Sequence, residues 1–217
     1  MKNLQLENKD SIQVKATNAI RKSILSGDFQ PGEKLVQEQL AEYLGISRMP
    51  IRESLKQLEI EGFVTIEPYR GAFVNDVDVS AIEETYALRS NLEKMALQRA
   101  APHLTHGDLE ELEDYIKLMD EENNPNDFVQ LNVTFHKLLL KHCDWGRLNK
   151  FIELLWNGYA QQTPEFLLGQ IDQSNIDHKV ILEHLKKGNF SEASLALQEH
   201  ISKTGARLVD YIQRINS

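Results

Sequence analysis

Four polar residues occupy positions that face the core of expected helices, and their side chains are of types that bind metals. Asn132 and His136 lie four residues apart in "LNVTFHKLLL", so they share one helical face with apolar neighbours. His178 and His200 lie on the apolar stripes of two later helices. Three imidazoles and an amide oxygen in one helical bundle can hold a divalent transition metal. The alternative is three core histidines, each hydrogen-bonded to a backbone carbonyl.

A fifth polar residue, Arg89, lies on an apolar helical stripe with Ile82 and Tyr86. Its spacing to Glu93 allows an ion pair between successive helical turns. The other interpretation is functional, because a guanidinium opposite a metal can bind the carboxylate of a small organic acid. The residues alone leave both interpretations open.

Helices must position these side chains, because no strand-like alternation follows Asp78. Apolar periodicity and turn signals predict about six helices in this part of the chain. Their expected ranges are roughly 79–101, 106–122, 126–142, 146–161, 172–187 and 191–214. The metal-ligand candidates therefore lie on the third, fifth and sixth of these helices.

The residues before Asp78 follow a different pattern. A helical stretch stops at Ser26-Gly27, "GDFQPGEKL" predicts a turn, and a short amphipathic helix with Leu40 and Tyr43 ends at Gly45. A third helix follows in "SRMPIRESLKQLEIEG". Two β-prone runs at 63–66 and 72–74 then flank "EPYRG", which suits a hairpin tip. A helix-turn-helix followed by a hairpin predicts a winged helix.

The third helix carries the residue types that a DNA-recognition helix needs. Arg48 and Arg52 lie four residues apart near its start, on the face opposite Ile51 and Leu55, and Lys56 continues this cationic stripe. Arginine bidentate to guanine is the commonest specific contact in the major groove. We therefore predict that this helix binds DNA.

The hairpin tip can also reach DNA, because Arg70 is cationic and Gly71 lets the main chain approach closely. The alternative for the recognition helix is a solvated face on which its second arginine or its lysine pairs with Glu53 or Glu59.

The overall charge supports a division of the chain. Residues 1–75 hold 10 basic and 10 acidic side chains, whereas the remainder holds 14 and 23, which accounts for the whole net charge of −9. Because residues 1–75 carry no net charge, their basic side chains can gather on one face of the first domain. No apolar run of about 20 residues and no signal-peptide pattern appears, so we expect a soluble cytoplasmic protein without a membrane partner.

The stretch "PGEKLVQEQLAEYLGISRMPIRESLKQLEIEGFVTIEPYRGAFV" resembles the DNA-binding domain of GntR-type transcriptional regulators. The elements "S-R-x-P-[VI]-R-E-x-L" and "G-[FL]-[VI]…R-G-x-[FY]-V" recur in that family. The resemblance implies operator binding as a homodimer, with Arg48, Arg52, Arg70 and Gly71 at the DNA. Some members place an arginine early in the second helix, where this chain reads "QEQ".

Residues 79 to 214 resemble the effector domain of the FadR-type branch of that family, known as the FCD domain, and of its VanR-like subgroup. The matching segments are "RSNLE", "NVTFH", "SNIDH" and "LQEHI". The resemblance implies that Asn132, His136, His178 and His200 bind Zn²⁺, Ni²⁺ or Mn²⁺ at the floor of an effector pocket. Asn132 stands where aspartate is more usual, and its neutral amide oxygen is a weaker donor.

We therefore predict a mainly α protein, with a winged helix-turn-helix domain at residues 1–77 and an all-helical effector-binding and dimerisation domain at residues 78–217. The predicted function is a metabolite-responsive regulator that binds a palindromic operator as a homodimer, not an enzyme. One alternative is a metal-dependent hydrolase, although no "HExxH" motif is present. The other is a DNA-binding protein whose second domain is purely structural.

Overall fold

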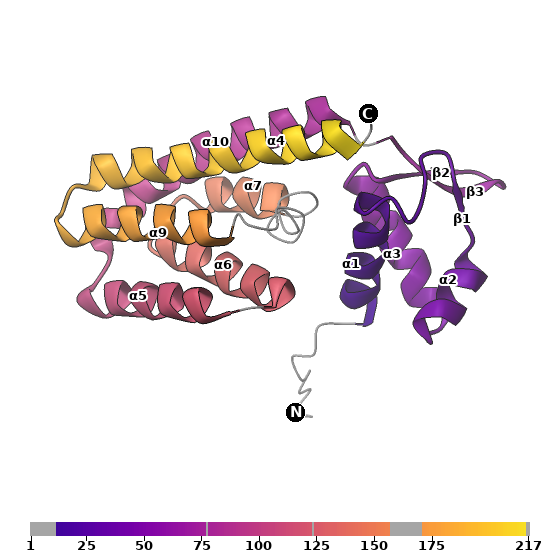
Figure 1. The fold of residues 1–217 in the computed structure, drawn as a ribbon, viewed down its shortest axis with the longest axis horizontal. Helices are drawn as coiled ribbons and strands as arrows, with labels where there is room; N and C mark the ends of the chain where they lie inside the picture. Colours follow the sequence, from indigo (N-terminus) through magenta and orange to yellow (C-terminus); the bar gives the residue numbers. More distant parts are fainter. Residues whose placement is uncertain (1–11, 77, 123, 157–170, 216–217) are drawn as a thin grey trace. The chain divides into compact units, whose positions relative to one another are not determined.

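The computed structural model describes residues 12–76, 78–122, 124–156 and 171–215 (Figure 1). The chain divides into two compact units, Met1–Val77 and Asp78–Ser217. Helices dominate both units, and a small antiparallel sheet lies in the first. The predicted fold class, a winged helix-turn-helix followed by an all-helical domain, is confirmed.

Three helices build the first unit: α1 (Ile12–Leu25), α2 (Gln37–Leu44) and α3 (Arg48–Ile60). The turn between α2 and α3 begins at Gly45, whose φ of +64° lies in the left-handed region that glycine adopts without steric cost. The expectation that Tyr43 faces the core was wrong, because its side chain is 84% exposed. Instead, Leu40 and Ala41 form the buried side of this short helix.

The wing is a three-stranded antiparallel sheet in the order β1-β3-β2. Its strands are β1 (Lys34–Leu35), β2 (Val64–Glu67) and β3 (Gly71–Val74). Val64 pairs with Val74 and Ile66 pairs with Ala72, which places Val64, Ala72 and Val74 in the core. The hairpin was predicted, but β1 was not, because two residues are too few to show strand periodicity.

A buried ion pair fixes the far end of α3. The Arg21 guanidinium on α1 donates from both Nε and Nη2 to the Glu61 carboxylate at distances of 2.8 Å. Both side chains are almost fully buried, at 3% and 5% exposure. The pair joins α1 to the end of α3, and removal of one partner would leave an uncompensated buried charge.

The second unit contains six described α-helices and a short 3₁₀ turn. They are α4 (Val79–Ala100), η1 (Ala101–His103), α5 (His106–Glu121), α6 (Pro125–Leu139), α7 (Gly146–Trp156), α9 (Ile171–Lys186) and α10 (Phe190–Ile215). Helix α6 ends three residues earlier than predicted, because residues 140–142 form a turn. The predicted extension of α7 to residue 161 lies outside the described residues.

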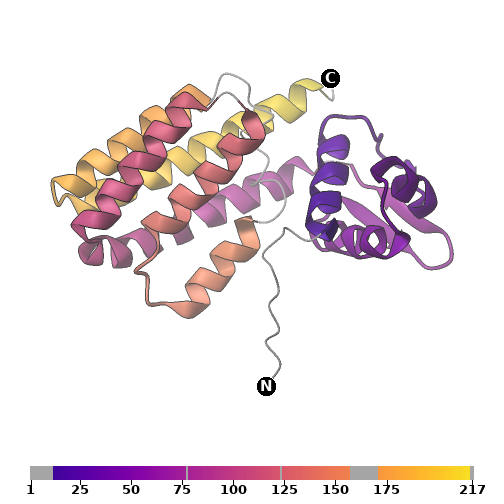
Figure 2. The ribbon, with the colours of Figure 1, turned by 90° about the horizontal axis from the view of Figure 1, so that it is seen from below.

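The bundle is organised around the two longest helices. Helix α10 packs along α4, as the yellow and magenta ribbons show in Figures 1 and 2, and α7 also packs on α4. Helix α5 packs on α6 and α9, and α9 packs on α10. The fully buried side chains between these helices include Leu97, Leu112, Met119, Phe128 and Phe135. The helices that carry the candidate metal ligands are therefore all anchored in one core.

Helices α4 and α10 approach each other tightly at Gly205. A Cβ atom at this position would lie 2.5 Å from both Cβ and Cγ of Tyr86. That distance is far inside van der Waals contact, so only glycine allows the two helices to meet here. The crossing therefore depends on one residue in the middle of α10.

We expect Gly205→Ala to lower the free energy of unfolding by about 1–3 kcal/mol, because the added methyl forces Tyr86 or a helix axis to move. The better helix propensity of alanine offsets part of this loss. Urea unfolding followed by circular dichroism measures the effect. Gly146→Ala is the matched control, since its Cβ would meet no atom within 4 Å. An unchanged stability of the Gly205 variant would contradict the tight crossing.

A capping box starts α5. The Thr105 hydroxyl accepts from the Asp108 N–H, and the Asp108 carboxylate accepts from the Thr105 N–H. Asp108 also accepts from Lys141 Nζ at 2.7 Å and contacts His142 Nε2 at 2.8 Å, so it joins α5 to the turn after α6. The Lys141 ammonium, followed by the Thr105 N–H, holds the pKa of the Asp108 carboxyl well below its usual range.

Asp108→Asn is expected to lower the free energy of unfolding by about 1–2 kcal/mol at pH 7, the usual value for a helix cap plus a charged hydrogen bond. The folded pKa of Asp108 lies below its unfolded value. Its ionised form therefore stabilises the fold fully above about pH 4 and progressively less as the pH falls. The difference between wild type and variant should thus narrow below about pH 4. Urea unfolding across this range tests the prediction, with exposed Asp114→Asn as control.

Candidate functional site

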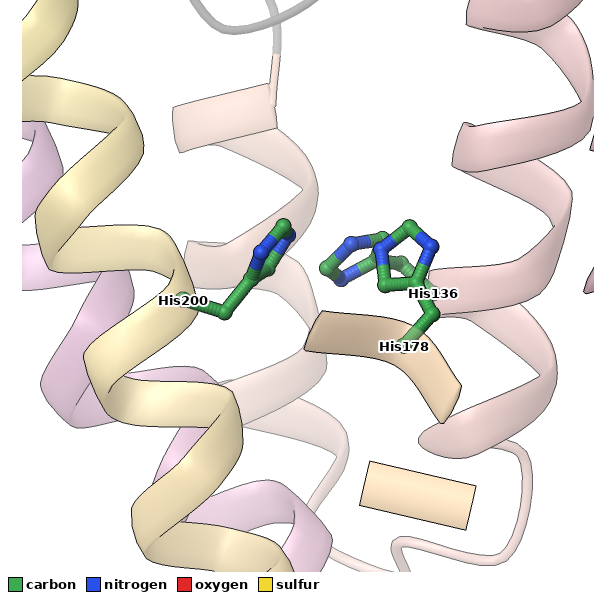
Figure 3. Close-up of side chains that lie close together, drawn as sticks. All are labelled: His136, His178 and His200. Carbon is green, nitrogen blue, oxygen red and sulfur yellow. The ribbon is translucent and has the colours of Figure 1, made fainter. Parts of the chain in front are cut away.

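Three buried histidines from three helices converge in the second unit. His136 of α6, His178 of α9 and His200 of α10 are 4%, 0% and 5% exposed. Their potential ligand atoms all lie within 4.8 Å of one another, and Figure 3 shows the three rings turned toward a common point. The ring centroids are 4.7 to 5.5 Å apart. The three side chains can therefore bind one small cation together.

Two of these imidazoles are oriented by carboxylates. Nδ1 of His136 lies 3.2 Å from Oε2 of Glu93, and Nδ1 of His200 lies 3.2 Å from Oδ2 of Asp177. An ionised carboxylate only accepts hydrogen bonds, so each Nδ1 carries the proton. In the neutral form of each ring, Nε2 then keeps its lone pair. This is the tautomer in which histidine binds metals, with the outer carboxylate raising the basicity of the ligand.

The third imidazole has an amide behind it. Nδ1 of His178 lies 3.4 Å from Oδ1 of Asn175. The orientation of this amide is fixed, because its Nδ2 donates to Oδ1 of Asp120 at 2.8 Å and to the carbonyl of Ile116 at 3.3 Å. Burial, followed by the charges of the other two cluster histidines, lowers the pKa of His178 well below its usual value. His178 is therefore neutral at pH 7, with Nε2 available as a ligand.

Two buried polar atoms, Nε2 of His178 in the cluster and Oδ1 of Asn132, have no hydrogen-bond partner among the described residues, and Asn132 lies one helical turn before His136 on α6. Nδ1 of His184, which is not part of the cluster, is a third such atom. A buried acceptor without a partner costs about 1–3 kcal/mol. A cation bound by the lone pairs of His178 and Asn132 would remove that cost. If the histidines were only hydrogen-bonded core residues, these two acceptors would have partners within the protein. The donor set therefore fits a divalent transition metal.

Glu93 is the centre of the polar network behind the histidines. Its fully buried carboxylate accepts from Arg89 Nε at 3.0 Å and from Trp156 Nε1 at 2.8 Å, and it contacts His136 through its other oxygen. Burial raises the pKa of Glu93, but the charge of Arg89 and the hydrogen bond with His136 lower it more, to about 2. The carboxylate is therefore ionised and holds three neighbours in place.

Arg89 makes the ion pair with Glu93 that its spacing allows, and its guanidinium lies 5.1 Å above the ring of Tyr86. The side chain is 10% exposed. Burial, opposed by the hydrogen bond to Asp177, lowers the pKa of His200, and the positive charge of Arg89 contributes to that lowering. The guanidinium is thus a fixed positive charge near the histidine cluster, in addition to its structural role.

In the first unit, the cations of α3 lie on its exposed side. The side chains of Arg48, Arg52 and Lys56 are 67%, 60% and 54% exposed, whereas Ile51 and Leu55 on the opposite side are buried. Each cation has a carboxylate within 4 Å. Such exposed ion pairs contribute little to stability, so phosphates can replace them at small cost.

The ion pairs of α3 differ in part from those expected. Glu53 pairs with both Arg52 and Lys56, at 3.5 and 3.2 Å. Glu59 instead accepts from the backbone N–H of Ile66 in the wing. Arg48 pairs with Glu38 of α2 at 2.7 Å, a contact between two helices that periodicity does not predict. Glu38 lies in the first turn of α2.

The tip of the wing is exposed and cationic. The Arg70 side chain is 70% exposed, pairs with Glu67 and lies 5.4 Å above the ring of Phe73. Gly71 has a φ of +115°, and the preceding Tyr69 has a φ of +63° with a fully exposed side chain. Glycine allows this backbone conformation at the first position of β3. The tip therefore projects an arginine and a tyrosine into solvent.

Comparison with known proteins identifies both units. The family model for bacterial regulatory proteins of the gntR family matches residues 12–74, and the model for the FCD domain matches residues 84–203. The chain belongs to the GntR family and carries an FCD domain. The GntR-family helix-turn-helix coincides with α1 to β3, and the FCD domain covers the histidine cluster.

Several relatives of this GntR-family protein are named as transcriptional regulators. The HTH-type regulator YdhC of Bacillus subtilis (strain 168) is 26% identical over 198 residues, covering 85% of each chain. McbR of Escherichia coli (strain K12) is 28% identical over 149 residues, or 67% of each chain. A GntR-family crystal structure from Pseudomonas syringae pv. tomato str. DC3000 is 29% identical, with a TM-score of 0.58, over 94% of this chain and 88% of that one.

The GntR-family protein is therefore a transcriptional regulator with a DNA-binding helix-turn-helix and an FCD effector domain, and it is not an enzyme. The metal-dependent hydrolase alternative is not favoured. The E. coli McbR/YncC structure shares the fold, with a TM-score of 0.69 at 23% identity over 93% of this chain and 99% of that one. Across the described residues, no helix is long and apolar enough to cross a membrane.

Sequence reasoning missed the outer layer of the regulator's histidine cluster. Asn175 lies three residues before His178 on the same helix, a spacing that could have indicated its role. Asp177 acts on His200, 23 residues away on another helix, and Trp156 reaches Glu93 across 63 residues. No local signal in the sequence connects these pairs.

Proposed function

We propose that this GntR-family regulator binds a palindromic operator as a homodimer and responds to a small organic acid at a metal-containing pocket of its FCD domain. The observation that carries the proposal is the cluster of His136, His178 and His200, with a lone pair of His178 left unpaired beside it. This cluster lies on the same chain as a winged helix with an exposed cationic recognition helix. A metal-dependent sensor and its output are thus combined in one protein.

The proposed DNA contacts are Arg48, Arg52 and Lys56 on α3, together with Arg70 and Gly71 at the wing. The exposure of the α3 cations and the weak ion pairs that they form support direct contact with base edges and phosphates. The positive φ at Gly71 supports a close approach of the wing backbone to DNA. An operator on the chromosome would locate the protein in the cytoplasm.

The proposed metal ligands are Asn132, His136, His178 and His200, and the metal is zinc, nickel or manganese. The imidazole ligands and the outer carboxylates Glu93 and Asp177 support a divalent cation, because the outer negative charges compensate for ligands that bring no charge of their own. When bound, the metal would supply a Lewis acid that attracts an anionic effector. The assignment to the VanR-like subgroup stays a prediction from the spacing of these residues.

Arg89 is the proposed partner for the effector carboxylate. Its guanidinium is largely buried, is held in place by Glu93, and influences the charge state of His200. A carboxylate between a fixed guanidinium and a metal would interact with both. We propose that such binding shifts the packing of the helices that carry the cluster and so changes the spacing of the two DNA-binding domains in the dimer.

An exposed apolar face supports homodimerisation. The α4 face, as we call it, consists of five exposed large side chains: Leu88 and Met95 of α4, Phe151 and Leu154 of α7, and Leu195 of α10, which are 40% to 59% exposed. Helix α4 packs against both α7 and α10, and the side chain of Lys94 on α4 donates to that of Gln198 on α10. Exposed apolar side chains on three helices that pack together suit an isologous dimer contact.

Sedimentation velocity tests this part of the proposal. Phe151→Glu would bury a charge in the dimer contact and is expected to shift the protein to monomers at micromolar concentration. Leu118→Glu is the control, because Leu118 is also about half exposed but lies on α5. If both variants remain dimeric, the α4 face is not the dimer contact.

The whole proposal is tested with untagged protein and a DNA duplex selected from a random library by the wild type. We expect about one equivalent of metal per chain, a palindromic selected sequence, and a shift in DNA affinity when small carboxylic acids are titrated. Removal of the metal by a chelator should abolish the response to the acids. Selected DNA with no metal and no response would instead support a purely structural second domain.

A further inference from the structure

A pocket lies beside α6 and α7, and none of the three cluster histidines lines it. It has a volume of about 330 Å³ and is formed by α6, the turn after it, and α7. Its lining includes Lys137, Leu140, Lys141, Ile152, Glu153 and Trp156. None of the proposed metal ligands lines this pocket, and neither does Arg89. The pocket is therefore separate from the proposed effector site.

The pocket has an apolar floor and a charged rim. Leu140, Ile152 and Trp156 are 7%, 2% and 9% exposed, so their side chains form a firm apolar surface. Lys137 and Lys141 lie four residues apart and are exposed at the rim. This combination suits a small molecule with an aromatic or alkyl body and an anionic group.

The charges at the rim favour a single negative charge on the ligand. Lys141 already forms an ion pair with Asp108 at 2.7 Å, and Glu153 contributes a carboxylate to the lining. Lys137 therefore supplies most of the attraction for an anion, and a second negative charge would meet Glu153. An aromatic monocarboxylate fits this pattern better than a dicarboxylate or a phosphate.

Trp156 connects this pocket to the histidine cluster. Its ring lines the pocket, while its indole N–H donates to Oε1 of Glu93 at 2.8 Å. The other oxygen of Glu93 contacts Nδ1 of His136 at 3.2 Å. A molecule that displaces the ring would disturb the carboxylate that orients a proposed metal ligand. Three side chains thus form a continuous path from the pocket to the cluster.

We infer that the pocket between α6 and α7 is a second ligand site, which takes a small aromatic monocarboxylate and acts on the histidine cluster through Trp156 and Glu93. The site extends the proposed function, because it would adjust the metal centre from outside the effector pocket. Its ligand binding does not require the metal, so the two proposals can fail independently.

Fluorine NMR of the full-length protein labelled with 5-fluorotryptophan tests this inference. The chain contains two tryptophans, so two resonances are expected, and Trp145→Phe assigns them. The probe is 3-phenylpropionate, with its neutral amide as comparison. We expect the acid to shift the Trp156 resonance saturably, both in untreated protein and after removal of metal by a chelator. The amide should bind about tenfold more weakly, as loss of a charge-assisted hydrogen bond predicts.

The variant Lys137→Gln should weaken binding of the acid by about tenfold for the same reason. The control Lys117→Gln, an exposed lysine on α5, should leave binding unchanged. Equal binding of acid and amide would overturn the inference, as would an unaltered affinity in Lys137→Gln. If the chelator abolishes the shift, the acid binds at the proposed effector site and the second site is wrong. A persistent shift in protein that binds no metal would support the second site while the metal proposal fails.

Discussion

His178→Ala is expected to weaken binding of a divalent transition metal by more than about 100-fold, because removal of an outer hydrogen bond alone costs up to about that factor. His178 is fully buried, its Nδ1 is held by Asn175, and its Nε2 is unpaired among the described residues. Among the described residues, the cluster contains no second histidine, cysteine, aspartate or glutamate of α9 that could replace it. Titration calorimetry with Zn²⁺ and metal analysis of untagged protein measure the loss.

The control for this prediction is His106→Ala, which removes an exposed histidine at the start of α5. Circular dichroism of both variants separates loss of a ligand from loss of the fold. His178→Gln keeps more side-chain volume in the core, so it should fold like the wild type and still lose metal. If the His178 variants kept full metal affinity, the cluster would not be the metal site.

Arg48→Ala and Arg52→Ala are each expected to weaken operator binding by about 10- to 100-fold, the effect of losing a bidentate arginine contact to a base. Both side chains are exposed on α3, and each forms a surface ion pair with a glutamate. Within the part of the chain that the structure describes, this weak ion pair is the only interaction that each arginine would have to give up in order to contact DNA. Fluorescence anisotropy with the duplex selected by the wild type measures the affinities.

The dependence of affinity on salt distinguishes the roles of these arginines. Loss of a phosphate contact lowers the slope of log affinity against log salt by about 0.9, whereas loss of a base contact relaxes the preference for one sequence. Lys15→Ala is the control, because Lys15 is an exposed cation of the same unit that lies on α1 and not on α3. If both arginine variants had the same operator affinity and the same salt slope as the Lys15 control, α3 would not be the recognition helix.

The helices of both units were predictable because their apolar residues follow helical spacing and their ends carry turn residues. Gly45 ends α2 and Thr105 caps α5 through local chemistry. The misjudged features depend on partners far away in the chain. Tyr43 has the right spacing for the core of α2, but no element covers it and it remains exposed. Strand β1 exists because it pairs with β3, not because of its own two residues.

The candidate site shows the same division. Spacing along single helices pairs Asn132 with His136 and Arg89 with Glu93, and apolar neighbours put each of them on an inner face. Whether these inner faces meet is decided by how α4, α6, α9 and α10 pack. The resemblance to GntR-type regulators supplied the connection between the three histidines in advance. It did not supply Trp156 as a donor to Glu93.

Apolar spacing along the chain sets which side of each helix is apolar, and therefore which polar residues enter the core. Turn residues and periodicity also predict the helix-turn-helix and its hairpin, because both are local properties. The packing of distant helices brings three histidines together, lets Glu93 hold Arg89, His136 and Trp156, and makes Gly205 necessary where α10 meets α4. The physical reason is that local spacing sets the direction of a side chain, whereas its partners are set by packing between distant segments.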